Sequence, residues 1–110
     1  MNNNLEALMV KQILASAKQA TTFACAPGNE HSVEVLFLDA ELLQGILEKS
    51  GVYGVSGGVW YDYSVKRVIE MLDHLDYVGT AEGTGSNEAV AEAAELSGLV
   101  KKLQARYNFN

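Results

Sequence analysis

The segment Gly51-Val-Tyr-Gly-Val-Ser-Gly-Gly-Val-Trp-Tyr-Asp-Tyr63 combines four glycines with four aromatic residues near the middle of the chain. Residues 52–53 and 59–61 have the composition of β-strands, and the glycine-rich residues 56–58 are typical of a turn. We therefore expect a β-hairpin here, although a functional loop would have a similar composition. The glycines do not match a phosphate-binding loop, because five residues separate the last of them from the helix expected next.

The aromatic residues at the end of this segment are candidate partner-binding residues. Neighbouring side chains of a strand point to opposite faces, so one of Trp60 and Tyr61 should be more exposed than the other. An exposed Trp or Tyr is a favoured binding anchor. The alternative is that these rings fill the core of a small domain.

Two stretches before the segment have apolar residues at helical spacing. The first covers residues 4–19, where Glu6 fits a capping box with Asn3. Its apolar stripe is wide enough to lie on a sheet or between two elements. The second covers residues 40–50 and ends where Gly51 can adopt a left-handed conformation.

A first hairpin is expected between these two helices. Residues 21–26 and 32–38 have strand composition, and Val33 and Phe37 share one apolar face of the second strand. The residues between the strands, Ala26-Pro27-Gly28-Asn29, fit a type II turn with positive φ at Gly28.

Two further helices are expected after the segment. The first covers residues 64–77, and a glycine-containing mobile linker over 80–85 follows it. The second covers residues 86–107 and would be roughly 33 Å long, about the diameter of a domain of this size. Part of this helix could extend beyond the domain and pair with a second copy, so a homodimer through helix 86–107 is a possible assembly.

These elements predict an α+β fold. The order is α-β-β-α-(β-β)-α-α, in which one or two hairpins form a small antiparallel sheet packed with about four helices. A chain of 110 residues that is 48% hydrophobic can build one compact core, so residues 1–110 are expected to form a single domain.

The charge is unevenly distributed. The chain carries a net charge of −6, but residues 30–95 hold thirteen acidic and three basic residues, a net charge of −10. Such a field repels phosphate backbones and attracts basic protein surfaces. The alternative is that the acidic surface only keeps the protein soluble.

We find no catalytic or cofactor motif and expect no enzymatic activity, no cofactor and no metal site. Glu70 and His74 have the spacing of two metal ligands, but two ligands do not make a site. Cys25, the single cysteine, is expected to be a small buried residue on a strand. The absence of a long apolar run and of a secretion signal predicts a cytoplasmic protein that does not bind membranes.

One stretch suggests an alternative function. It resembles the passage from recognition helix to wing in winged-helix DNA-binding domains, particularly the gamma domain of bacterial DNA translocases. The resemblance implies DNA binding through the helix 64–77, with Lys66 and Arg67 at the phosphates or bases. Acidic residues on the same helix would oppose a phosphate backbone, so direct nucleic-acid binding is the alternative and not the main prediction. The residues that carry the resemblance are Arg67, Ile69, Glu70, Leu72, Val78, Gly79, Ala81, Glu82 and Gly83.

The sequence thus predicts a non-enzymatic acidic interaction protein that binds a basic protein surface. In its sharpest form it is a phage-type inhibitor, or nucleic-acid mimic, that places carboxylates where phosphates would lie and so blocks a nucleic-acid-binding complex. The predicted partner-binding residues are Asp73, Asp76, Glu82, Glu88, Glu92, Glu95, Trp60 and Tyr61.

Overall fold

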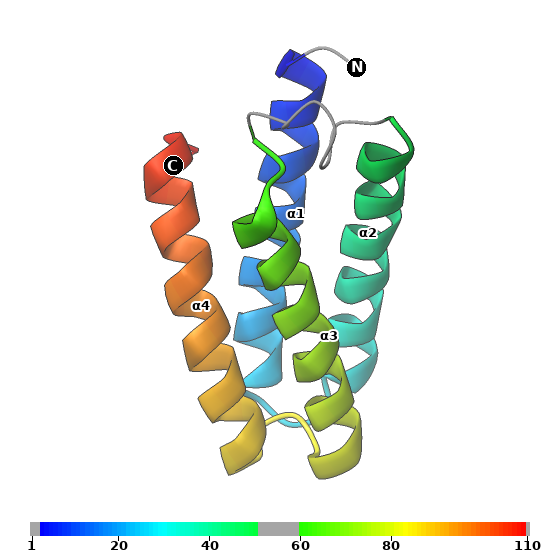
Figure 1. Cartoon of the computed structure of the whole chain (residues 1–110). Coiled ribbons are helices and arrows are strands. Elements are labelled where there is room, and N and C mark those ends of the chain that lie inside the picture. The colour runs from blue at the N-terminus through cyan, green and yellow to red at the C-terminus, as the bar shows by residue number, and fades with distance from the viewer. Residues whose placement is uncertain (1–2, 51–59, 110) are drawn as a thin grey trace.

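A computed structural model describes residues 3–50 and 60–109, and it shows an antiparallel bundle of long helices (Figure 1). Helices α1 and α3 run in one direction and helices α2 and α4 in the other. Short connections over residues 25–29 and 83–86 join α1 to α2 and α3 to α4, as is usual in up-down-up-down bundles. The helices are α1 (Asn3–Ala24), α2 (Glu30–Lys49), α3 (Tyr63–Glu82) and α4 (Asn87–Tyr107).

The bundle is flattened, with extents of 40 × 25 × 17 Å. Each helix packs on the next, α4 packs on α1, and α1 also contacts α3, whereas the described parts of α2 and α4 do not touch. Helices α1 and α3 therefore form the centre of the bundle, and α2 and α4 form its two outer edges. A wide face of α1 is buried, which fits the predicted position between other elements and not on a sheet.

The α+β prediction is wrong, because none of the residues in 3–50 and 60–109 forms a strand. The two arms of the first predicted hairpin belong to α1 and α2. In the last turns of α1, the hydroxyls of Thr21 and Thr22 donate to the carbonyl oxygen of Lys18 at 2.6 and 3.4 Å. These bonds satisfy the hydroxyls within the helix, so the β-branched residues do not require a strand.

Helix α2 begins ten residues earlier than the sequence predicts, at Glu30. Its buried residues Val33, Phe37, Ala40 and Leu47 follow helical spacing. The alternation of apolar residues over 32–38 therefore arises from two apolar faces of one helix. The turn before it does have positive φ at Gly28, +82°, but it joins two helices and not two strands.

The second predicted hairpin falls mostly on residues 51–59, which lie outside the described residues. Its last residues, Trp60 and Tyr61, are described and belong to the connection that leads into α3. Helix α3 starts after Asp62, whose carboxylate caps it by accepting hydrogen bonds from the backbone N–H groups of Ser64 and Val65.

The predicted linker over 80–85 is shorter than expected, because α3 continues to Glu82. The loop that follows packs on the α1–α2 turn. The hydroxyl of Thr84 accepts from the backbone N–H of Asn29 at 3.0 Å and donates to the carboxylate of Glu30 at 3.2 Å. Gly85 has φ +83°, and a Cβ there would lie 2.8 Å from Pro27, so this glycine permits the close approach of the two loops.

Glu6 fixes the opposite end of the bundle. Its side chain is 3% exposed, and Oε2 accepts hydrogen bonds from the backbone N–H groups of Trp60 and Tyr61, both at 2.8 Å. Glu6 therefore ties α1 to the start of α3. Within the described ranges, no helix is long and apolar enough to cross a membrane.

Candidate functional site

Four glutamates of α2 lie on one side of the helix. The spacing of Glu30, Glu34, Glu41 and Glu48 places them within roughly 40° of one another around the helix axis. This side faces α3, because Glu34 interacts with Asp76 of that helix. Glu30 accepts from Thr84 just after α3, and Glu48 accepts from the hydroxyl of Tyr61 just before it at 2.7 Å. We call these four residues the α2 glutamate row.

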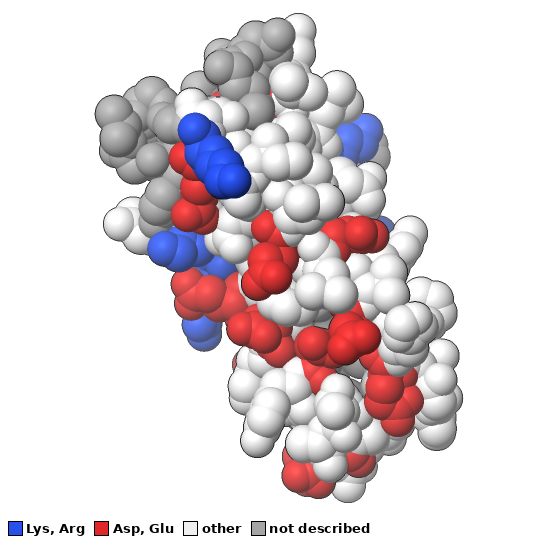
Figure 2. All heavy atoms as spheres, turned by 90° about the vertical axis from the view of Figure 1, so that its right-hand side faces the viewer, with Lys and Arg blue, Asp and Glu red and all other residues white. Residues whose placement is uncertain are grey.

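Two of the predicted binding residues on α3, Asp73 and Asp76, complete this surface. The two carboxylates lie close enough to interact with each other electrostatically, and Asp76 also interacts with Glu34 of the α2 glutamate row. Figure 2 shows the result: acidic side chains form a band across the face that α2 presents, while basic side chains lie mainly toward one edge of the view. We define the acidic face as the α2 glutamate row together with Asp73 and Asp76.

Asp76 shows that charge on the acidic face is poorly neutralised. Partial burial, and then the carboxylates of Glu34 and Asp73, raise the pKa of Asp76 above its ordinary value. One of its oxygens, Oδ1, is buried and finds no hydrogen-bond donor among the described residues. Each of these conditions disfavours the ionised carboxylate, and a nearby cation would favour it.

The other predicted acidic residues lie elsewhere. Glu92 and Glu95 line an open hollow of about 260 Å³ between α3 and α4, together with Arg67, Glu70 and His74. In this hollow His74 Nδ1 lies 3.1 Å from a carboxylate oxygen of Glu92, and Arg67 lies 3.8 Å from Glu70. This surface is mixed in charge and partly paired.

The remaining two acidic residues are at helix ends. Glu88 is exposed in the first turn of α4, and Glu82 is the exposed last residue of α3. The structure therefore does not bring the predicted acidic residues into one site: Asp73 and Asp76 join the acidic face, and the others do not.

The two predicted aromatic anchors belong to the interior. Tyr61 is 1% exposed, and its hydroxyl also accepts from the side-chain amide of Gln44 at 2.9 Å. Trp60 is half-buried, and its ring stacks on Phe109 with centroids 5.4 Å apart and meets Tyr107 edge-on at 5.5 Å. Tyr61 thus joins the α2–α3 connection to α2, and Trp60 joins it to the C-terminal end of α4. This packing is the alternative that the sequence left open.

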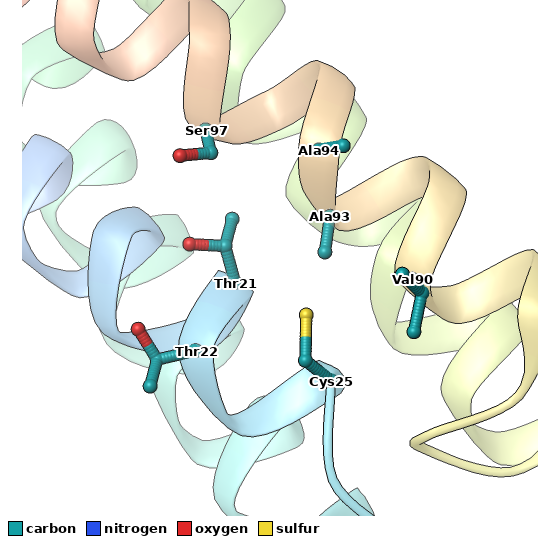
Figure 3. A pocket seen from close by; sticks show the side chains of 7 residues that line it. All are labelled: Thr21, Thr22, Cys25, Val90, Ala93, Ala94 and Ser97. Atoms are coloured by element: carbon teal, nitrogen blue, oxygen red, sulfur yellow. The ribbon is translucent and has the colours of Figure 1, made fainter.

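Cys25 is exposed, contrary to the expectation of a buried residue on a strand. It follows the last turn of α1 and lines a hollow of about 390 Å³ between α1 and α4. Figure 3 shows its sulfur pointing into this hollow, opposite the small side chains of Ala93 and Ala94 on α4. The hollow is mostly apolar and contains no pair of groups suited to acid–base chemistry.

Two further predictions concern metal binding and dimerisation. In the described part of the chain, no three His, Cys, Asp or Glu side chains lie close enough to hold a metal ion, although Glu70 and His74 do line one hollow. The apolar stripe of α4 is buried within the bundle at Ala93, Leu96 and Val100, and pairing of an overhanging part of this helix with a second copy stays a prediction.

The α2 glutamate row is the part of the surface that sequence reasoning missed. The signal was present, because residues 30, 34, 41 and 48 recur with the period of a helix. The strand assigned to 32–38 concealed it, since it placed Glu34 in a different element from Glu41 and Glu48.

The winged-helix resemblance also fails at the fold level. Residues 87–107 form helix α4 where a wing strand would begin, and Arg67 is engaged by Glu70. The structure does not test DNA binding through α3, which stays a prediction. Comparison of the chain with protein-family models, with curated proteins and with solved structures found no match.

Proposed function

We propose that this protein is an acidic interaction protein that binds a basic surface of another protein through the acidic face of α2 and α3. The observation that carries the proposal is the grouping of carboxylates from two helices on one face, where Asp76 Oδ1 is buried without a hydrogen-bond donor among the described residues. Partial burial, and then the carboxylates of Glu34 and Asp73, raise the pKa of Asp76, which agrees with this grouping. A lysine or arginine of a partner would lower the repulsion among these carboxylates and could donate to Asp76.

The finer form of the proposal is that the partner is a nucleic-acid-binding protein. Carboxylates spaced along a rigid helix present negative charge to basic groups that otherwise contact phosphates. In this form, nucleic acid and the protein compete for the same partner, so duplex DNA or RNA should displace the protein from it.

The test uses two triple variants with the same change of charge. Glu34→Lys, Glu41→Lys and Asp73→Lys reverse the acidic face without touching the glutamates that bond Thr84 and Tyr61. Glu82→Lys, Glu88→Lys and Glu95→Lys reverse exposed carboxylates outside it. Each variant is used to capture proteins from nuclease-treated extract of the source cells, after circular dichroism has verified folding.

We expect the first triple variant to lose the basic proteins that the wild type captures and the second to retain them. Equal capture by both triple variants would contradict the proposal. Loss of capture by the second variant alone would assign the interaction to the residues beside α4.

A further inference from the structure

The outer side of α2 carries a row of exposed apolar side chains. Val35 is 40% exposed, Leu38 51%, Leu42 65% and Ile46 38%. Their spacing of three, four and four residues places them within roughly 80° around the helix axis, opposite the buried face of α2. We call these four residues the α2 apolar row.

The position of α2 explains why the α2 apolar row has no partner among the described residues. Helix α2 lies at an outer edge of the flattened bundle and packs only on α1 and α3 in the part of the chain that is described. Scattered exposed leucines are common, but four aligned residues over three turns form the kind of patch that binds another molecule.

Carboxylates border the α2 apolar row on both sides. The α2 glutamate row follows the edge that faces α3, and the exposed Asp39 lies at the other edge. Lys49 stands at one end of the apolar row, and one lysine does not offset this charge. An occupant must therefore combine an apolar stripe with flanking cations.

We propose that the outer side of α2 binds an amphipathic helix of a partner protein, in which an apolar stripe is flanked by lysine or arginine. The proposal deepens the proposed function and rests on it. A helix suits this surface because residues at i, i+3, i+7 and i+11 of α2 present the spacing that helix-to-helix packing uses. Gly45 lies between the apolar and glutamate rows with open space where a Cβ would be, so a partner side chain can approach the backbone there.

A second copy of this chain fits the row poorly. In an antiparallel pair related by a two-fold axis, like edges face one another, so the two glutamate rows would meet. In a parallel pair, the glutamate row of each copy would meet Asp39 of the other. Both arrangements place carboxylates opposite carboxylates, and the charge pattern therefore selects a basic occupant.

The test uses two synthetic peptides of leucine and lysine with identical composition. In the first, leucine and lysine segregate on opposite faces of a helix; in the second, the order is scrambled so that no apolar face forms. Affinities for the full chain are measured by fluorescence anisotropy at low and high salt. The variants are the double substitution Leu38→Ser and Leu42→Ser, the double substitution Glu34→Gln and Glu41→Gln, and Leu8→Ser as a matched control. Leu8 is 63% exposed and lies on α1 beside Phe109.

We expect the wild type to bind the segregated peptide more tightly than the scrambled one, and the double leucine variant to lose roughly tenfold in affinity for the segregated peptide. The Leu8→Ser variant should bind both peptides as the wild type does. The double glutamine variant should weaken binding of both peptides and reduce the salt dependence.

The outcomes separate the two proposals. If the glutamine variant weakens binding but the leucine variant does not, the apolar row is not the docking site and this inference is overturned while the proposed function stands. If neither variant affects either peptide, both are overturned. A wild-type dimer in sedimentation analysis that the leucine variant dissociates would assign the row to a second copy, and would also overturn the inference.

Discussion

Two carboxylates, the buried Glu6 and the partly buried Asp76, have opposite effects on the stability of this bundle. The carboxylate of Glu6 is almost inaccessible but accepts two backbone hydrogen bonds, so its burial is compensated. Asp76 lies beside two other carboxylates and has an oxygen without a donor among the described residues, so its charge is not compensated. The first residue stabilises the fold, and the second opposes it at neutral pH.

Replacing Glu6 should be costly. Glu6→Ala leaves the backbone N–H groups of Trp60 and Tyr61 without their acceptor, and we expect the free energy of unfolding to fall by about 2–3 kcal/mol. Glu6→Gln keeps one acceptor oxygen and should lose less. Urea denaturation measures the free energy of unfolding of each variant. The control is Glu95→Ala at an exposed position, for which we expect a change within about 0.5 kcal/mol. Equal stability of the two alanine variants would show that the tie to α3 does not matter.

Replacing Asp76 should have the opposite effect. Its pKa is raised in the fold, so the stability associated with the protonated carboxyl is present at acidic pH and is lost as pH rises through the folded-state pKa. Asp76→Asn removes the charge, and we expect it to stabilise the protein at neutral pH by up to about 1 kcal/mol. The gain should shrink as pH falls and Asp76 becomes protonated in the wild type. Thermal unfolding of Asp76→Asn and of the wild type, from neutral to acidic pH, measures this gain in stability, and Glu95→Gln serves as the control. A lower Tm for Asp76→Asn than for the wild type at neutral pH would contradict this explanation.

Among the contacts between helices, one joins the start of α3 to the end of α4. Asp62 caps α3 through Oδ1, and its Oδ2 accepts from the hydroxyl of Tyr107 in the last turn of α4 at 2.9 Å. Burial, followed by the hydrogen bond to Asp62 and the charge of Asp62, raises the pKa of Tyr107 from 10.0 to about 12. The same carboxylate therefore fixes the helix start and the closing contact of the bundle.

The contact predicts an alkaline transition. Because the pKa of Tyr107 is raised on folding, its contribution to stability is complete below pH 10.0 and is lost as pH rises toward about 12. Tyr107→Phe should lower the stability at neutral pH by about 1 kcal/mol and remove this part of the alkaline loss. Ultraviolet titration should show late tyrosine ionisation that decreases by one tyrosine in Tyr107→Phe but not in Tyr77→Phe, whose ring is 68% exposed. An unchanged late ionisation in Tyr107→Phe would refute the assignment.

The helices that sequence reasoning predicted well are those with one apolar stripe and a clear cap. For α4, the cap at Ser86 and the buried positions Ala93, Leu96 and Val100 follow the expected spacing. For α2, two apolar faces interleave over 32–38 and imitate the alternation of a strand, and Pro27-Gly28 before them fits a hairpin as well as it fits a helix connection. Local propensity could not decide between these, because the buried contacts with α1 and α3 select the helix.

The candidate site was only partly predictable for the same reason. The concentration of negative charge over residues 30–95 is visible in the sequence, and Asp73 and Asp76 do lie on the acidic face. Their companions Glu34 and Glu41 could be identified only once 30–49 was known to be a helix. The grouping of Asp73 with Glu92 and Glu95 assumed that nearby positions in sequence share a surface, and the bundle places them on different sides of α3.

At the scale of the whole molecule, flattening of the bundle determines which surfaces are available. Helices α1 and α3 meet at the centre, so α2 is an outer helix that combines the glutamate row with the apolar row. The second outer helix, α4, exposes mixed charges and buries its apolar stripe. We therefore propose that a basic partner binds the α2 side of the molecule and not the α4 side.

Amide chemical shifts measured by NMR during titration with a lysine homopeptide test this assignment most directly. The account predicts that the largest changes occur at Glu34, Glu41, Asp73 and Asp76, and that they weaken as salt screens the interaction. Changes concentrated at Glu88, Glu92 and Glu95, or spread evenly over both outer helices, would contradict it.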